Sequence, residues 1–366
     1  MSKIYHHGGE MRIAMILPSL EKSGPGIHVE ALSRALVAIG CYVEVFYLRS
    51  CEKKCLLFNF TKCTKFSFSI KNIRYLSGFD IIHTHGFFPD LYGVILTKIF
   101  VNSIHVSTMH NFLEQDLSSR YNGWKRTFYI FLWTNVIKKI SHKVVFTELA
   151  KDYYQRLVGG HINVVGSGID VFSVLEELST RSYLNSSVVD VLHEVKKNKK
   201  IIGSTSIITE IKSLDLIVRA LPDLPDYAAV FVGGGPLEND LIIMAEKLGV
   251  AERCIFIGFT GNPLPYLSFF DVYAMPSKSE SFGLSLFEAI AAKLPIVCRD
   301  LPVFQELLPD VGLHKFDGTL LSFVDTIRNI NGKKSTELAF EKLLDKYDMK
   351  NVACRYVKFY QEIAEQ

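Results

Sequence analysis

The 366-residue sequence lacks several features that would assign it to a specialised class of proteins. Its formal net charge is only +3, so a strongly basic surface for nucleic-acid binding is not expected. No segment reaches the ~20 uninterrupted apolar residues that a membrane-spanning helix needs. Residues 1–10 are polar and precede one short apolar run over 11–20, which does not fit a secretory signal peptide. These absences favour a cytoplasmic globular protein that is free in solution or rests on a membrane surface.

The seven cysteines lack the even number and regular spacing of a disulfide framework. Such a distribution favours a reducing, cytoplasmic environment. Cys51, Cys55 and Cys63 lie close enough in sequence to suggest a metal site, but a fourth ligand at a usual spacing is missing. We therefore expect no bound metal.

The length of the chain exceeds what one ordinary hydrophobic core holds, so two domains are expected. Apolar runs alternate with amphipathic segments in two successive series, as in parallel α/β sheets. The sequence predicts an α/β protein of two doubly wound, Rossmann-like domains facing each other across a cleft. A turn with two glycines places the boundary between domains 1–170 and 171–345. A terminal helix over 346–366 follows, and its packing on the first domain is one option.

Two glycines follow the first predicted strand. The strand covers 11–17, and a loop over 18–26 contains Gly24 and Gly26 before a helix over 27–39. Open α/β sheets bind ligands at the carboxyl ends of their strands, where this loop lies. Taken alone, the loop is equally consistent with the plain start of a helix.

Histidines follow two later strands of the first domain. The strand over 104–109 delivers His110 at its carboxyl end, on the side of the sheet where ligands bind. The strand over 79–85 carries His83 and His85. We expect the latter two to line the end of the sheet and not to catalyse.

The segment 122–143 is rich in aromatic residues and has cations towards its ends, Lys125, Arg126, Lys138 and Lys139. One interpretation is a helix that rests on an anionic membrane. The other, which we favour, is a core helix with solvated tips.

The most informative stretch of the second domain covers 276–292. It follows an apolar run over 271–275, typical of a buried strand, and leads through a polar turn into a helix. Glu280 lies in the turn and Glu288 in the helix, with Gly283 between them to permit close approach of the backbone. The amides of a helix's first turn can hold an anion. The stretch therefore indicates a site for a phosphorylated, hydroxyl-rich ligand.

Glu280 and Glu288 stand in an E-x7-E arrangement that resembles the retaining glycosyltransferases of family 4, which have the GT-B fold. The stretches 79–86, 107–110, 165–170 and 232–236 are similar to further motifs of that family, in the family's order. The resemblance implies transfer of a hexosyl or N-acetylhexosaminyl group from a nucleotide-diphosphate donor to a hydroxyl of a glycan or lipid-linked acceptor. The expected process is synthesis of a cell-surface polysaccharide such as lipopolysaccharide or capsule.

The resemblance also implies roles for single residues. Glu280 and His110 would be the catalytic residues beside the transferred sugar. Glu288 would accept hydrogen bonds from the ribose hydroxyls, and Lys212 would pair with the diphosphate. The remaining donor-binding positions would be Gly24, Gly26, Gly234, Ser281, Phe282, Gly283 and Leu284.

One position departs from the family pattern. The family usually carries an arginine six residues before the lysine, where this chain has Ser206, so Lys278 could supply the second cation. Two alternatives stay open: a non-catalytic GT-B relative that binds a nucleotide-sugar or a partner, and a nucleotide-sugar epimerase. The resemblance implies a UDP- or GDP-linked donor and no metal or other cofactor. It also leaves open a peripheral contact with the inner membrane face and gives no role to nucleic acid.

Overall fold

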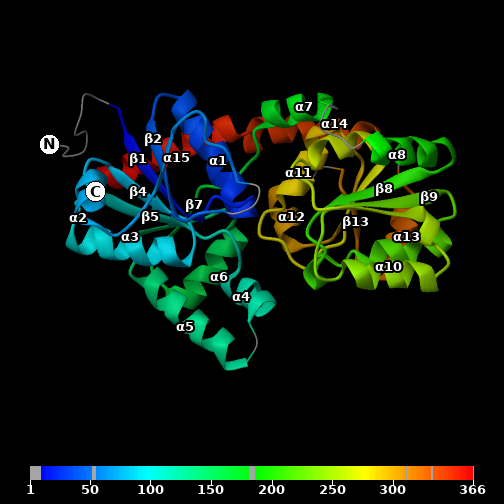
Figure 1. Cartoon of the computed structure of the whole chain (residues 1–366), viewed down its shortest axis with the longest axis horizontal. Coiled ribbons are helices and arrows are strands. Elements are labelled where there is room, and N and C mark those ends of the chain that lie inside the picture. Colours follow the sequence, from blue (N-terminus) through cyan, green and yellow to red (C-terminus); the bar gives the residue numbers. More distant parts are fainter. Residues whose placement is uncertain are drawn as a thin grey trace. The chain divides into compact units, whose positions relative to one another are not determined.

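The computed structural model of the chain describes residues 10–51, 55–121, 123–180, 186–309, 312–330 and 333–365. The chain forms two compact units, Met1–Gly168 with Tyr347–Gln366, and Ile169–Lys346. Each unit contains one parallel sheet with helices on its faces (Figure 1). The prediction of two doubly wound α/β domains is confirmed. Residues 1–9, nearly all of the polar amino-terminal stretch, lie outside the described residues.

The first unit contains a seven-stranded sheet in the order β3-β2-β1-β4-β5-β6-β7. Its strands are β1 (Arg12–Ser19), β2 (Tyr42–Arg49), β3 (Lys62–Lys65), β4 (Ile81–Thr84), β5 (Ile104–Thr108), β6 (His142–Val145) and β7 (Ile162–Val164). Strands β2 and β3 follow β1 on one side of the sheet, and β4 pairs with β1 on the other side. The carboxyl ends of β1 and β4 therefore form a topological switch point, where sheets of this kind bind ligands.

Helices cover both faces of this sheet, and the carboxyl-terminal helix is one of them. They are α1 (Gly24–Ala38), α2 (Ile70–Leu76), α3 (Phe87–Ile99), α4 (Leu113–Arg120), α5 (Gly123–Lys138), α6 (Glu148–Val158) and α15 (Met349–Ala364). Helix α15 packs against α1, and its Val352 and Tyr356 are fully buried in one core with Ile13 and Leu36. Burial of such a side chain contributes roughly 1.5–3 kcal/mol. The helix at the end of the chain is thus part of the first unit.

The second unit contains a six-stranded sheet in the order β10-β9-β8-β11-β12-β13. Its strands are β8 (Lys200–Thr205), β9 (Tyr227–Val232), β10 (Cys254–Gly258), β11 (Val272–Met275), β12 (Ile296–Arg299) and β13 (His314–Phe316). The helices include α7 (Val171–Ser179), α8 (Ser186–Asn198), α9 (Asp215–Ala220), α10 (Glu238–Lys247), α11 (Leu284–Ala291), α12 (Pro302–Leu307), α13 (Leu320–Arg328) and α14 (Lys333–Lys342). The switch point of this sheet lies between β8 and β11.

The structure corrects the predicted start of the first helix. Gly24 and Gly26, expected in a loop before a helix over 27–39, lie in the first turn of α1. Ser23 caps this helix, because its side chain accepts a hydrogen bond from the Gly26 amide at 3.3 Å. Pro25 fits a first turn, where its missing N–H leaves no bond unmade.

Helix α5 is less buried than the core-helix interpretation predicts. Thr134 and Ile137 near its end are buried, but Trp124, Phe128 and Phe131 are 73%, 49% and 63% exposed. In Figure 1, α4 and α5 extend away from the sheet of the first unit. Asn122, where the predicted segment began, lies outside the described residues. In the part of the chain that the structure describes, no helix combines the length and apolar character needed to cross a membrane.

Candidate active site

The turn between β11 and α11 lies at the switch point of the second sheet. Gly283 precedes the first residue of α11 and has φ +86° and ψ 54°, a left-handed conformation that favours glycine. A Cβ atom there would lie 3.0 Å from the ring of Phe304. Phe282 is 2% exposed and stacks on Phe287 with ring centroids 4.6 Å apart. The stacking of Phe282 on Phe287 and the left-handed conformation of Gly283 therefore determine where the helix begins.

The loops after β8 and β11 meet at this turn. The Lys278 amide donates to the Ile211 carbonyl at 2.8 Å. Lys212 Nζ lies 2.6 Å from Glu280 Oε1, and the two side chains are 26% and 9% exposed. The structure thus brings together the predicted diphosphate lysine and one predicted catalytic carboxylate. Lys278 Nζ lies 3.0 Å from Glu210 Oε1 in an exposed ion pair.

A buried tyrosine lies beneath the second carboxylate. Glu288 is half-buried in α11, and Tyr273 of β11 is fully buried. Tyr273 Oη lies 3.0 Å from Thr205 Oγ1 at the end of β8, and the Ser285 hydroxyl also bonds to it. Burial raises the pKa of Tyr273 to about 12, and the charge of Glu288 acts in the same direction. The phenol therefore stays protonated and links the two strands that flank the switch point.

The three glycines after β9 differ in how closely other atoms surround them. A Cβ atom on Gly233 would lie 2.1 Å from the Ser206 carbonyl oxygen, and one on Gly235 would lie 2.3 Å from that of Ile208. These two glycines let the loop after β9 pack on the loop after β8. Gly234, the predicted donor contact, has more room, since its nearest neighbour would lie 3.3 Å away. Ser206 Oγ is buried without a hydrogen-bond partner among the described residues.

Histidines gather at the switch point of the first sheet. His85 follows β4 and His110 follows β5, and these strands pair so that Thr84 lies opposite Ser107. His85 Nδ1 lies 2.9 Å from His110 Nε2. His28 of α1 joins them, with its ring centroid 5.3 Å from that of His110. Strand order explains the cluster, because neighbouring parallel strands end at the same edge.

These imidazoles are uncharged near neutral pH. Burial lowers the pKa of His28 to about 3. Burial, and then repulsion from neighbouring histidines, lowers the pKa values of His85 and His110 well below their ordinary value. His110 can therefore donate or accept a hydrogen bond but does not offer a positive charge.

The two glycines of α1 differ in what surrounds them. A Cβ atom on Gly26 would lie 2.8 Å from both the Glu21 carbonyl oxygen and Leu56 Cδ1. A Cβ atom on Gly24 would meet nothing within 4 Å. Packing therefore requires Gly26, whereas the backbone at Gly24 is open to a ligand. The Gly26 and Ile27 amides already donate to Ser23, and Pro25 has no N–H, so the Gly24 amide is the one in this turn that we consider for an anion.

Sequence reasoning missed Tyr273 and His28. Tyr273 interrupts an otherwise apolar strand, and His28 lies on the buried face of an amphipathic helix. A polar group in such a setting is the signal that could have identified each residue.

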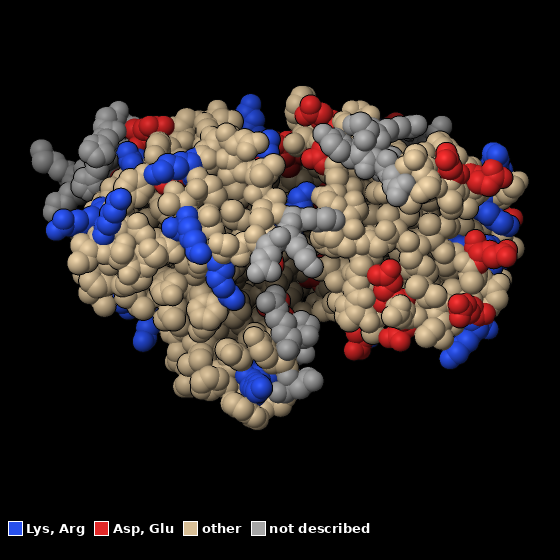
Figure 2. All heavy atoms as spheres, viewed as in Figure 1, with Lys and Arg blue, Asp and Glu red and all other residues tan. Residues whose placement is uncertain are grey.

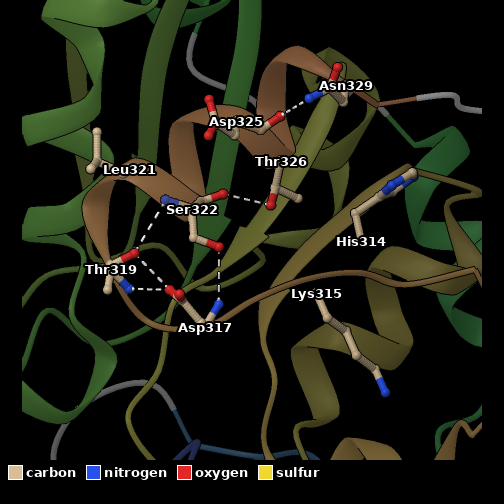
Figure 3. Close-up of a pocket in the computed structure, with 9 residues that line it drawn as sticks. All are labelled: His314, Lys315, Asp317, Thr319, Leu321, Ser322, Asp325, Thr326 and Asn329. Atoms are coloured by element: carbon tan, nitrogen blue, oxygen red, sulfur yellow. Dashed lines mark hydrogen bonds between the residues drawn. The ribbon is translucent and has the colours of Figure 1, made fainter.

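A surface hollow of ≈ 660 Å³ between β13 and α13 contains none of the predicted site residues (Figure 3). Its polar groups mostly cap α13. Asp317 Oδ1 accepts from the Thr319 amide at 2.8 Å and from its hydroxyl at 2.7 Å. Ser322 Oγ accepts from the Asp317 amide at 3.2 Å. These groups therefore bond to one another at the start of α13.

The described residues contain no group of three or more His, Cys, Asp or Glu side chains arranged to hold a metal ion. This finding covers Cys51, Cys55 and Cys63, which carry free thiols.

Comparison with known proteins agrees with this architecture. Residues 22–171 match the family model described as Glycosyltransferase Family 4, and residues 191–325 match Glycosyl transferases group 1. The chain is 26% identical over 357 residues to the O-antigen biosynthesis glycosyltransferase WclY of Escherichia coli, covering 96% of this chain and 99% of that protein. It is 33% identical over 119 residues, 30% of this chain and 34% of the relative, to the lipopolysaccharide core biosynthesis mannosyltransferase LpsB of Rhizobium meliloti.

Solved structures share the fold over nearly the whole chain. Anabaena Alr3699/HepE, solved in complex with UDP and glucose, superposes with a TM-score of 0.76 at 15% identity, covering 96% of this chain and all of that one. The sucrose-phosphate synthase of Thermosynechococcus elongatus has the same TM-score, 0.76, and covers 97% of this chain and 99% of its own. The fold is GT-B. The chain belongs to the glycosyltransferases with this fold.

Proposed function

We propose that the chain is a retaining glycosyltransferase of family 4 that transfers a hexosyl or N-acetylhexosaminyl group from a UDP- or GDP-linked donor. The observation that carries this proposal is the ion pair of Lys212 and Glu280, 2.6 Å apart at the β8–β11 switch point. A cation for the diphosphate and a carboxylate for sugar hydroxyls thus lie side by side where such sheets bind ligands.

The donor would be bound mainly by the second unit. Glu288 accepts hydrogen bonds from the two ribose hydroxyls, a good match for a carboxylate. The turn residues Ser281, Phe282, Gly283 and Leu284 and the glycine Gly234 contact the sugar and the diphosphate through their backbones. Gly24 supplies its backbone amide to a donor phosphate from the first turn of α1, and Gly26 permits close approach of the backbone there.

The chemistry requires stabilisation of the leaving group more than a strong base. The bond between the anomeric carbon and the diphosphate oxygen breaks, and its electron pair goes to the diphosphate. Lys212 and the backbone amides stabilise the negative charge that develops there. The acceptor oxygen bonds to the same face of the anomeric carbon, and its proton passes to the departing phosphate oxygen. Attack on that face retains the anomeric configuration.

No step of this reaction is assigned to a metal or another cofactor. Lys212 and the amides supply the positive charge that a divalent ion supplies in other transferases. We therefore propose that transfer continues in the presence of a chelator.

The acceptor is proposed to be a hydroxyl of a glycan or of a lipid-linked glycan, in lipopolysaccharide, O-antigen or capsule synthesis. The names of the relatives support this class. One is an O-antigen biosynthesis glycosyltransferase, and another, from Campylobacter jejuni, acts on a diphospho-undecaprenol-linked acceptor by its name.

Helix α5 supports a peripheral contact with an anionic membrane surface, on the cytoplasmic side. Its exposed Trp124, Phe128 and Phe131 recur at a helical spacing, next to Lys125 and Arg126. The helix contains no acidic residue. Aromatic side chains flanked by cations are typical of helices that lie in a membrane interface. Acidic side chains instead gather around α10 of the second unit, on the face shown in Figure 2.

Hydrolysis or transfer from a panel of nucleotide-sugars tests the proposal. We expect sugar release from at least one donor and loss of release in Glu280→Gln. Glu194→Gln is the matched control, because Glu194 forms an exposed ion pair with Lys197 on α8. Binding of a donor without release or transfer would favour the non-catalytic alternative. Conversion of the donor to an epimer would favour the epimerase.

A further inference from the structure

His85 is enclosed between two other histidines. Its ring centroid lies 4.4 Å from that of His83 and 5.1 Å from that of His110. His85 is 1% exposed, and its Nδ1 lies 2.9 Å from Nε2 of His110. The second ring nitrogen, Nε2, is buried and has no hydrogen-bond partner among the described residues.

The ring of His83 packs against the ring of His85 and is itself fixed by two hydrogen bonds. Its Nδ1 lies 2.6 Å from Tyr360 Oη, and its Nε2 lies 2.8 Å from Thr108 Oγ1. Both ring nitrogens are therefore engaged, and the His83 ring cannot turn without breaking a bond. Its face covers the His85 ring, since the two planes are inclined by only 34°. His85 is thus constrained by packing as well as by its bond to His110.

The hydrogen bond between two neutral imidazoles admits only two proton arrangements. In one, His110 donates from Nε2, and the remaining proton of His85 lies on its sealed Nε2 as a donor without an acceptor. In the other, His85 donates from Nδ1, and its sealed Nε2 is a bare lone pair. A buried donor without a partner is rarer than an acceptor without one. The second arrangement is therefore favoured.

This arrangement determines what His110 presents to its surroundings. With Nε2 accepting from His85, a neutral His110 carries its proton on Nδ1. That atom is not among the sealed nitrogens, and the His110 side chain is half-buried. The exposed part of the ring is then a hydrogen-bond donor.

We propose that His85 is a positioning residue that holds His110 in the neutral Nδ1–H tautomer, so that His110 donates a hydrogen bond to an oxygen of the transferred sugar. The contact with the sugar rests on the proposed function, whereas the tautomer does not. His85 does not touch the substrate in this account. It acts only through the hydrogen bond that its Nδ1–H donates to His110 Nε2.

The test combines the ¹⁵N spectrum of the histidines with kinetics on the full chain. Protein labelled with ¹⁵N-histidine is compared with His110→Gln, which assigns the His110 signals. We expect a protonated Nδ1 and an unprotonated Nε2 for His110. In His85→Phe, the donor to Nε2 is lost, and the proton of His110 is expected to move to Nε2 or to exchange between both sites.

Kinetics then follow the tautomer. His85→Phe is expected to lower kcat about 10- to 100-fold, as misplaced catalytic groups do, with little change in KM for the donor. His85→Asn can donate from its amide nitrogen at the place of Nδ1, and it is expected to restore the Nδ1–H spectrum and most of kcat. His105→Gln is the control for loss of a buried histidine, because His105 bonds to Thr84 and not to His110.

An Nε2–H tautomer of His110 in the unmodified protein, or an Nδ1–H tautomer that persists in His85→Phe, would overturn the inference whatever the activity. A tautomer that moves as expected supports the inference. If kcat then stays unchanged in His110→Gln as well, the failure lies in the proposed contact of His110 with the sugar.

Discussion

Lys212 and Glu280 form an ion pair, with Nζ and Oε1 2.6 Å apart, although the two residues lie 68 positions apart in the sequence. Each follows a strand, and β8 and β11 pair with Val272 opposite Ile202. The topology of the sheet thus creates the pair. Lys212 neutralises the carboxylate that would face the sugar, and a bound diphosphate would compete with Glu280 for the same cation.

Lys212→Met is expected to weaken binding of a nucleotide-sugar about 10- to 100-fold. A hydrogen bond to a charged group contributes roughly 1.5–3 kcal/mol, and this substitution removes the charge with little change of volume. Titration calorimetry with the active donor measures the effect. Lys197→Met, which removes the cation of an exposed pair on α8, is the control and should bind normally. Equal affinities for both variants would contradict the role of Lys212.

Gly26→Ala is expected to lower the stability of the fold, whereas Gly24→Ala is expected to weaken donor binding. A Cβ atom at Gly26 is crowded by Glu21 and Leu56, and such overpacking typically costs about 1–3 kcal/mol. Gly24 has open space, so Gly24→Ala should keep its melting temperature yet raise KM for the donor about 10-fold. Thermal melts and donor kinetics check both. A normal KM in Gly24→Ala would show that no ligand approaches the backbone there.

The buried histidines predict a loss of stability in mild acid. Burial lowers the pKa values of His28 and His105 to about 3, so between pH 6.5 and 3 the unfolded chain binds protons that the folded chain does not. Their contribution is complete above pH 6.5 and declines by about 1.4 kcal/mol per pH unit for each histidine as the pH falls. Asp90 acts in the opposite direction, because burial raises its pKa to about 6 and its protonation favours the folded state below that pH.

Denaturant unfolding at pH 7 and pH 5 tests this balance. The free energy of unfolding is expected to be lower at pH 5, and His105→Gln should reduce the dependence on pH by the share of one histidine. A free energy that rises towards pH 5 would contradict the neutral state of the cluster.

Removal of the cations of α5 is expected to weaken binding to anionic vesicles. Lys125→Gln with Arg126→Gln should reduce the partition coefficient about 30-fold, since each cation near such a surface contributes about 1 kcal/mol. Trp124→Ala should weaken binding by loss of apolar contact. Phe172→Ala is the control, because Phe172 is 78% exposed on α7 of the other unit. Co-sedimentation that is equal for all four proteins would refute the membrane contact.

The alternation of strands and helices was predictable because strands covered on both faces are apolar throughout. The start of α1 was predicted too late, since glycines suggest a loop and the cap of Ser23 that places Gly24 in the helix was not recognised. Strand β13 has only three residues at the edge of its sheet, too few for a sequence pattern. Short elements of this kind are specified by pairing with a neighbour.

The sequence predicted single residues of the candidate site but not the contacts between them. Lys212 and Glu280 were singled out separately, and their contact follows from strand order, which the sequence does not state. The same reason hid the bond between His85 and His110. Tyr273 was read only as one residue of an apolar strand. Its role was not recognised, because the hydroxyls that bond to it lie on β8 and α11.

The central claim is that the turn between β11 and α11 binds a nucleotide-sugar with Glu288 on the ribose. Thermal unfolding with a panel of UDP- and GDP-sugars, for the unmodified chain and for Glu288→Gln, measures it most directly. At a donor concentration 100-fold above Kd, the unmodified chain should gain roughly 2.7 kcal/mol of stability and a higher Tm, and Glu288→Gln should lose most of that gain. A panel that raises no Tm, or a gain that is equal in both proteins, would contradict the claim.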